Sequence, residues 1–106
     1  MKTQIKMRKQ EVIKILRKNM DKIKSFGVKR IGIFGSAVRD QMNEKSDIDV
    51  VVEFEKTRGG LKDFIGLIDF LETLFNREVD VLTVDSIDTI RIKSVRERIK
   101  NEVEYV

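Results

Sequence analysis

One stretch, residues 31–54, constrains the fold of this 106-residue chain more than any other. It places the Gly-Ser pair Gly35–Ser36 directly after a short apolar run that is β-branched and aromatic. Ten residues later, Asp47 and Asp49 open a second apolar run. Both runs have the length and composition of buried strands, and we predict them over Ile31–Phe34 and Asp47–Phe54. The stretch therefore predicts two core strands with polar, chemistry-bearing residues between them.

The Gly-Ser pair predicts a turn from a strand into a helix. The segment Ala37–Met42 has the length of one short helix, for which Ser36 would be the N-cap. Such a turn offers free backbone N–H groups and the positive end of a helix dipole, which suits a phosphate group. A Gly-Ser pair alone is a common turn, so the phosphate interpretation depends on the aspartates that follow it.

Asp47 and Asp49 lie one residue apart at the head of the second predicted strand. Side chains alternate along a strand, so these two point to the same face with Cα atoms roughly 6–7 Å apart. Their charges repel by on the order of 2–3 kcal/mol at an effective dielectric near 20. Mg²⁺ would neutralise such a pair and keep coordination positions open for substrate phosphates. Alternatively, the aspartates cap the backbone or pair with Lys45 or Arg39.

Asp80 is a third acidic candidate. It falls in the middle of a further predicted strand, Glu78–Val84, where aspartate is disfavoured. One interpretation is an ion pair with Arg77 or a lysine at the sheet edge. The other is a third carboxylate that converges on Asp47 and Asp49 from an adjacent strand.

The remaining pattern alternates helices with these strands. Apolar residues recur at helical spacing, and a last helix begins after an N-cap at Asp85 or Ser86. The alternation predicts a single α/β (α+β) domain over residues 1–106. The other expected elements are helices over Thr3–Phe26 and Leu61–Phe75 and a short edge strand within Glu102–Val106.

Composition excludes several classes of chemistry. The chain has no cysteine and no histidine, so disulfides, thiolate nucleophiles and Cys- or His-based zinc sites are excluded, and any general base must be Asp, Glu, Lys or Tyr. No apolar run approaches a membrane span and no signal-peptide pattern opens the chain, so we expect a soluble, cytoplasmic protein. Residues 1–30 carry eleven Lys/Arg against two acids, whereas residues 31–90 carry six against thirteen. The basic start is either a solvated helix face or a surface for nucleic acid or an acidic partner.

At Gly35, Ser36, Asp47 and Asp49 the chain resembles the minimal nucleotidyltransferases (MNT) of the DNA polymerase β superfamily. Their signature is Gly-Ser, ten residues, then Asp-x-Asp. The resemblance covers most of the chain and includes Arg39, three residues after the serine, and the segments FGVKRIGIFGS, SDIDVVVEF and VRERIKNEVEYV. The chain departs from the family at Val38 and Asp40, where alanine and glycine are common. An acid beside the phosphate turn would weaken phosphate binding or point to solvent.

The resemblance implies a polymerase β-like fold of order α-β-α-β-α-β-α, with a small mixed sheet flanked by helices. It also implies transfer of AMP from ATP to a hydroxyl, with two Mg²⁺ ions. Gly35, Ser36 and Arg39 would bind the nucleotide. The catalytic metal ligands would be Asp47, Asp49 and Asp80.

The resemblance further implies a partner. Standalone members of this family are usually antitoxins encoded beside a HEPN-domain ribonuclease toxin, and they silence it by AMPylating a toxin tyrosine. We therefore expect a protein adenylyltransferase in a hetero-oligomer with such a toxin, with no membrane or nucleic-acid partner. Three alternatives stay open: a non-catalytic antitoxin, a nucleotidyltransferase that acts on a small molecule, and a nucleic-acid-binding protein with a basic N-terminal helix.

Overall fold

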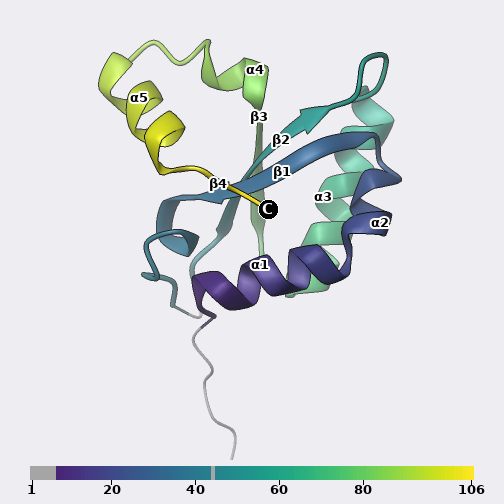
Figure 1. Cartoon of the computed structure of the whole chain (residues 1–106), viewed down its shortest axis with the longest axis horizontal. Helices are drawn as coiled ribbons and strands as arrows, with labels where there is room; N and C mark the ends of the chain where they lie inside the picture. Colours follow the sequence, from purple (N-terminus) through teal and green to yellow (C-terminus); the bar gives the residue numbers. More distant parts are fainter. Residues whose placement is uncertain (1–6, 44) are drawn as a thin grey trace, which may run out of the picture.

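The protein folds into a four-stranded mixed sheet with helices on both faces (Figure 1), as described by a computed structural model for residues 7–43 and 45–106. The strand order is β3-β2-β1-β4, in which β2 runs parallel to β3 and antiparallel to β1. This confirms the predicted mixed α/β fold. In chain order the elements are α1 Lys9–Lys18, α2 Met20–Lys24, β1 Val28–Phe34, the 3₁₀ turn η1 Gly35–Ala37, β2 Ile48–Phe54, α3 Leu61–Phe75, β3 Val79–Thr83, α4 Val84–Ile87, α5 Lys93–Glu102 and β4 Glu104–Tyr105.

Helices α1, α2 and α3 cover one face of the sheet and bury the main core (Figure 1). The helical spacing of their apolar residues places one stripe of each helix against alternate residues of the strands. Side chains that are fully buried in this core include Val12, Leu16, Ile23, Ile31, Ile33, Ile48, Val50, Val52, Leu67 and Leu71.

The opposite face of the sheet carries α4 and α5 over a smaller apolar cluster. Its buried members are Phe34, Val51, Ile87 and Ile99. Residues paired across adjacent strands share a face, so Asp49, the register partner of Phe34, belongs to this face. The candidate site therefore lies on the side of the sheet that α5 covers.

The long first helix that the sequence predicted over Thr3–Phe26 is two shorter helices. Residues 3–6 lie outside the described ranges, and α1 ends at Lys18 before α2 begins at Met20. Between them, Asn19 leaves the helical region at φ −110° and ψ 18°, and its side-chain amide donates to the Ile15 carbonyl at 2.8 Å. Asparagine competes in this way for backbone groups, which breaks the helix. Gly27, at φ +84°, follows this helical segment, directly after the predicted last helical residue Phe26.

The short helix predicted over Ala37–Met42, with Ser36 as its N-cap, is wrong. The chain makes only η1, whose N-cap position is Phe34 and which has no side-chain capping bond. Asp40 then adopts the left-handed region at φ 55°, and the Gln41 N–H closes the turn on the Ser36 carbonyl at 2.9 Å. A left-handed residue followed by such a bond is the usual end of a helix, so the helix stops after one turn.

Other boundaries differ by less. The predicted helix Leu61–Phe75 is confirmed as α3, and β2 begins one residue after Asp47. The single last helix is instead α4 and α5, and the cap of α4 is Thr83, whose side chain accepts from the Ser86 N–H. In the described part of the chain, no helix is long and apolar enough to cross a membrane.

Candidate active site

Three segments meet at one end of the sheet: the β1–η1 turn, the start of β2 and the start of β3. The strand register places Asp49 opposite Phe34 of β1 on one side and opposite Asp80 of β3 on the other. Asp49 therefore lies between the Gly35 turn and Asp80. Asp47 is the residue directly before β2, and it is exposed.

Gly35 is in close contact with Asp49. A Cβ atom on Gly35 would lie 2.3 Å from Asp49 Oδ2, and the glycine φ is +69°. Only glycine lacks the Cβ that would clash here, and glycine also adopts the left-handed backbone conformation without steric cost. The glycine thus lets the turn approach the carboxylate of Asp49 directly.

The surroundings of Asp49 raise its pKa from an ordinary value of 3.8 to about 6. Partial burial is the largest cause, followed by the negative charge and hydrogen-bonding contact of Asp80 and then by the charge of Asp47. The positive charge of Arg39 acts in the opposite direction. Arg39, Asp47 and Asp80 are therefore near enough to Asp49 for their charges to act on its carboxylate.

The site fits a hard cation in its chemistry. Asp49 and Asp80 are neighbouring carboxylates whose repulsion helps to raise the pKa of Asp49, and a divalent ion would relieve that repulsion. Within residues 7–43 and 45–106, however, no three acidic side chains stand ready-arranged around a metal position. The pair Asp49–Asp80 is the part of the predicted ligand set that the fold brings together, and the role of Asp47 stays a prediction.

Two of the predicted phosphate donors contact Glu102, which is not among the predicted site residues. The Gly35 N–H donates to Glu102 Oε2 at 2.9 Å, and Arg39 forms an ion pair with Glu102 Oε1. Arg39 also donates through Nε to Gln41 Oε1 at 2.9 Å. A signal for Glu102 exists in the sequence, because it is an acid at the end of a helix, where negative charge is unfavourable.

The two residues that depart from the family pattern have structural roles. The Asp40 carboxylate accepts a hydrogen bond from the Lys9 N–H at 2.6 Å, at the start of α1. It therefore accepts from a backbone N–H at a helix terminus while Asp40 stays exposed, which agrees with the solvent-facing alternative; a weakening of phosphate binding by this acid stays a prediction. Val38 is half-buried and packs against the main core.

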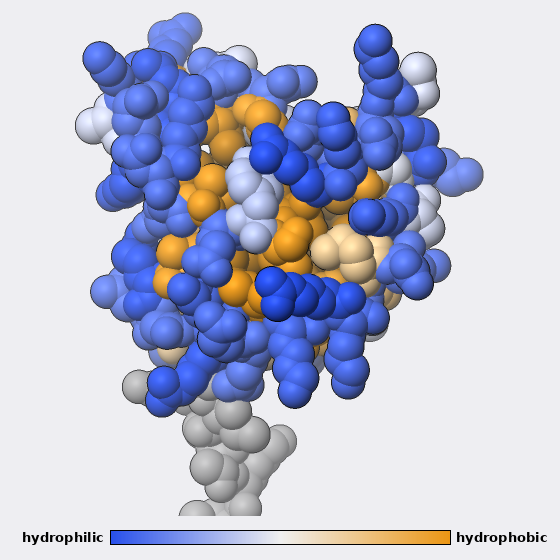
Figure 2. Space-filling view, in the orientation of Figure 1, coloured by the Kyte–Doolittle hydropathy of each residue, from blue (hydrophilic) through white to orange (hydrophobic). Residues whose placement is uncertain are grey.

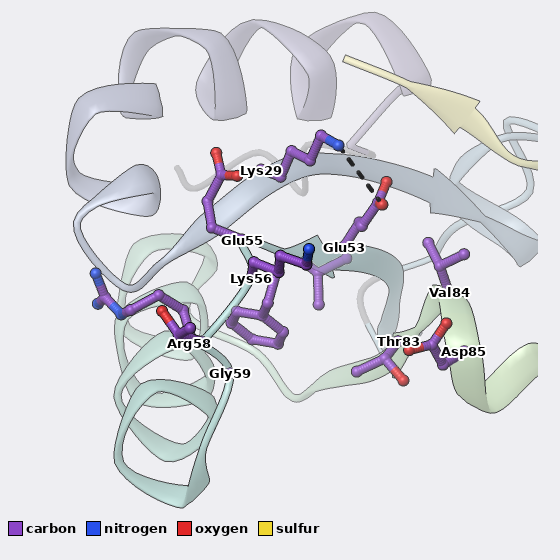
Figure 3. Close-up of a pocket in the computed structure, with 12 residues that line it drawn as sticks. Lys29, Glu53, Glu55, Lys56, Arg58, Gly59, Thr83, Val84 and Asp85 are labelled. Carbon is purple, nitrogen blue, oxygen red and sulfur yellow. Dashed lines mark ion pairs between the residues drawn. The ribbon is translucent and has the colours of Figure 1, made fainter.

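A surface hollow in the described part of the chain is separate from these residues. It measures about 750 Å³ and lies near the ends of β2 and β3 that are farthest from Asp49 and Asp80, where Figure 3 shows Lys29, Glu53, Lys56, Thr83 and Asp85 around it. Five residues of strand, roughly 16 Å, separate Asp49 from Phe54 at the rim of the hollow. The hollow contains none of the predicted site residues, so we place the candidate site at the Gly35 turn.

Comparison with known proteins adds a family to this geometry. The family model described as "Nucleotidyltransferase domain" matches residues 11–106. The protein adenylyltransferase MntA of Thermococcus cleftensis is 40% identical over 81 residues, which cover 76% of this chain and 77% of the relative. A Methanocaldococcus jannaschii protein, provisionally named a protein adenylyltransferase, is 46% identical over 78 residues, covering 73% of this chain and 90% of the relative.

Solved structures share the fold. A structure provisionally named a minimal nucleotidyltransferase has a TM-score of 0.72 at 26% identity and covers 92% of this chain and 95% of that one. A toxin–antitoxin complex with AMP-PNP has a TM-score of 0.57 at 20% identity, with 92% and 70% of the two chains covered. A complex of the tri-AMPylated Shewanella oneidensis HEPN toxin with its MNT antitoxin has a TM-score of 0.51 at 20% identity, with 92% and 66% covered.

Proposed function

The chain belongs to the nucleotidyltransferase domain family, and from this premise we propose that it transfers AMP from ATP to a tyrosine hydroxyl of a HEPN-domain toxin and so acts as the antitoxin. The observation that carries the proposal is the register of three strands. This register supports a site in which the Asp49–Asp80 pair lies beside the Gly35 turn, and Arg39 contacts the same Glu102 carboxylate as the Gly35 N–H. Paired carboxylates beside anion donors are what metal-assisted phosphoryl chemistry requires.

The turn and Arg39 would bind the distal phosphates. The donors are the Gly35 N–H, the Ser36 hydroxyl and the guanidinium of Arg39, which is 44% exposed and can reach a ligand from the surface. Hydrogen bonds from a backbone N–H and a guanidinium to phosphate oxygens are charge-assisted and directional. They would fix the triphosphate so that its α-phosphorus lies toward the carboxylates.

Asp47, Asp49 and Asp80 would hold Mg²⁺, which supplies charge neutralisation and Lewis-acid polarisation of the α-phosphate when bound. Asp80 is exposed at the start of β3, where an acceptor from another chain can approach. We assign it the role of orienting the acceptor hydroxyl and receiving its proton. The hydroxyl oxygen bonds to the α-phosphorus as the bond to pyrophosphate breaks, and Arg39 stabilises the leaving pyrophosphate.

The choice of acceptor rests on the relatives. A protein adenylyltransferase at 40% identity supports a protein acceptor, and the AMP-PNP complex supports an adenine nucleotide as donor. The complex of an MNT antitoxin with an AMPylated HEPN toxin supports the toxin as acceptor. For this chain, donor and acceptor remain part of the proposal.

The test is incubation with ATP, Mg²⁺ and a HEPN-domain protein encoded beside this chain, followed by intact-mass measurement. We expect mass increments of whole AMP units on the partner's tyrosine, absent with the Asp49→Asn variant. Asp69→Asn is the matched control, because Asp69 is an exposed acid on α3, on the other side of the sheet. A stable complex without any transfer would contradict the enzymatic proposal in favour of a binding-only antitoxin.

A further inference from the structure

The Glu102 carboxylate lies against the Gly35 turn and Arg39 of the candidate site. Its two carboxylate oxygens accept from the Gly35 N–H, at 2.9 Å, and from Arg39. These are two of the three donors that the proposed function assigns to the nucleotide phosphates. The Glu102 side chain is only 13% exposed, so its contacts with the two donors are largely shielded from solvent.

The position of Glu102 is set by the packing of α5 and not by any preference of the helix. Glu102 is the last residue of α5, where the helix dipole disfavours a negative charge. Ile99, one turn earlier, is buried in the cluster with Phe34 and Val51 and so anchors this end of α5 on the sheet. The contacts of Glu102 reach residues 63 and 67 positions away in the chain, and they are what favours an acid at this end of the helix.

We propose that Glu102 is an internal competitor of the nucleotide: its carboxylate fills the phosphate position in the empty enzyme and must leave when a triphosphate binds. The inference rests on the proposed function, because it takes the Gly35 turn and Arg39 to be the phosphate donors. Carboxylate and phosphate oxygens accept the same charge-assisted hydrogen bonds, and one N–H cannot serve both anions fully. A triphosphate carries more negative charge than one carboxylate, so it can displace Glu102 at a cost in affinity.

The same geometry keeps the empty site ordered. Without a counter-anion, Arg39 would lose an ion pair and the Gly35 N–H would lose its acceptor. Glu102 therefore holds both donors near their working positions until a phosphate replaces it. A residue that only positions Arg39 would make binding weaker when removed, whereas a competitor makes binding tighter, so the two roles predict opposite signs.

The experiment compares the affinity of a non-hydrolysable ATP analogue, with Mg²⁺, for the wild type and for Glu102→Gln by calorimetry. Glutamine keeps the size and an acceptor oxygen for the Gly35 N–H but removes the charge. We expect the variant to bind about tenfold more tightly, the change expected when a charge-assisted hydrogen bond becomes a neutral one. Tripolyphosphate should show the same gain, because the competition concerns the phosphates and not the base.

Two further variants separate local from general effects. Glu97→Gln removes the same charge from an exposed position of α5 and should leave the affinity unchanged. Glu102→Asp keeps the charge but shortens the side chain, which weakens its contacts with the Gly35 N–H and Arg39. If these contacts compete with the phosphates, this variant should also bind the ATP analogue more tightly. Thermal unfolding of each variant shows that it is folded.

The outcomes are distinguishable. If the wild type binds the analogue and Glu102→Gln binds it equally or more weakly, Glu102 is no competitor, while the proposed function stands. If neither protein binds the analogue or tripolyphosphate, the proposed function fails and the inference fails with it.

Discussion

At the scale of single residues, the ionised carboxylate of Asp49 lowers the free energy of unfolding when no cation is bound. Its pKa of about 6 in the folded state exceeds the ordinary value of 3.8, so folding takes up protons between these two values. The folded state therefore loses stability as the pH rises from 3.8 to 6, and the full penalty remains above pH 6. The charge of Asp80 adds to this penalty, which a bound cation would reverse.

We predict that Asp49→Asn raises the free energy of unfolding at neutral pH, in the presence of a chelator. The expected gain is about 1–2 kcal/mol, because solvent screening discounts the roughly 3 kcal/mol that the full shift represents. Urea denaturation across the pH range measures it, and the gain should vanish below pH 3.8. If the free energies of unfolding of the wild type and the variant change in parallel between pH 3.8 and 6, Asp49 does not destabilise the folded state.

A second residue-scale prediction concerns Gly35. We expect Gly35→Ala to destabilise the fold by about 1–3 kcal/mol and to abolish nucleotide binding, since the new Cβ would meet Asp49 Oδ2 at 2.3 Å from a left-handed backbone. The control is Gly60→Ala, because no atom lies within 4 Å of a Cβ there. That variant should lose less than about 1 kcal/mol, as alanine is a poorer N-cap than glycine, and keep its affinity for nucleotide. Equal losses in both variants would argue against a special role for the Gly35 contact.

At the scale of elements, Asp40 connects the η1 turn to the start of α1. Its carboxylate accepts from the Lys9 N–H, and its backbone at φ 55° ends the η1 turn. We predict that Asp40→Ala lowers the free energy of unfolding by about 1–2 kcal/mol, because the helix terminus loses its acceptor and alanine tolerates the left-handed region poorly.

Asp40→Asn is the matched control for that prediction. Asparagine keeps an acceptor oxygen and adopts the left-handed region readily, so its unfolding midpoint in urea should stay close to that of the wild type. If Asp40→Asn is as destabilised as Asp40→Ala, the negative charge and not the hydrogen bond is what matters.

The elements also show how far the sequence alone predicts this fold. The α3 helix and the positions of the core strands follow from local periodicity, and α3 was predicted to the residue. The helix expected over Ala37–Met42 failed because a left-handed Asp40, bonded across 31 residues to Lys9, ended it after one turn. Local propensity contains no information on such a bond.

Some contacts of the candidate site were predictable from the sequence, and others were not. Gly35, Asp47 and Asp49 form a motif with fixed spacing, and the structure places Asp49 and Asp80 in register as an adjacent-strand interpretation required. The contact of Glu102 with the turn could not be predicted, because it depends on how α5 packs on the sheet. Such contacts depend on how a helix packs on the sheet, which the spacing of residues in the sequence does not reveal.

At the scale of the whole molecule, the basic helix α1 and Asp49 of the candidate site belong to opposite faces of the sheet. Helix α1 buries Val12 and Leu16 in the main core, whereas the Asp49 face carries α4 and α5. Polar and charged side chains cover most of the face that Figure 2 shows, with apolar side chains between them. Lys14 and Lys18 are exposed on α1, which covers the face of the sheet opposite to Asp49.

This separation predicts that the double variant Lys14→Gln, Lys18→Gln keeps its function. Removing two exposed charges should change the free energy of unfolding by less than about 0.5 kcal/mol, and AMP transfer and nucleotide affinity should be unchanged. If the basic face were instead a nucleic-acid surface, the wild type would bind RNA or DNA with a steep dependence on salt, and the variant would lose much of that binding. Titration of fluorescent oligonucleotides at low and moderate salt distinguishes a solvated face from a nucleic-acid surface. We expect only weak binding that moderate salt abolishes. Tight binding by the wild type that is lost in the variant would instead assign α1 a nucleic-acid partner.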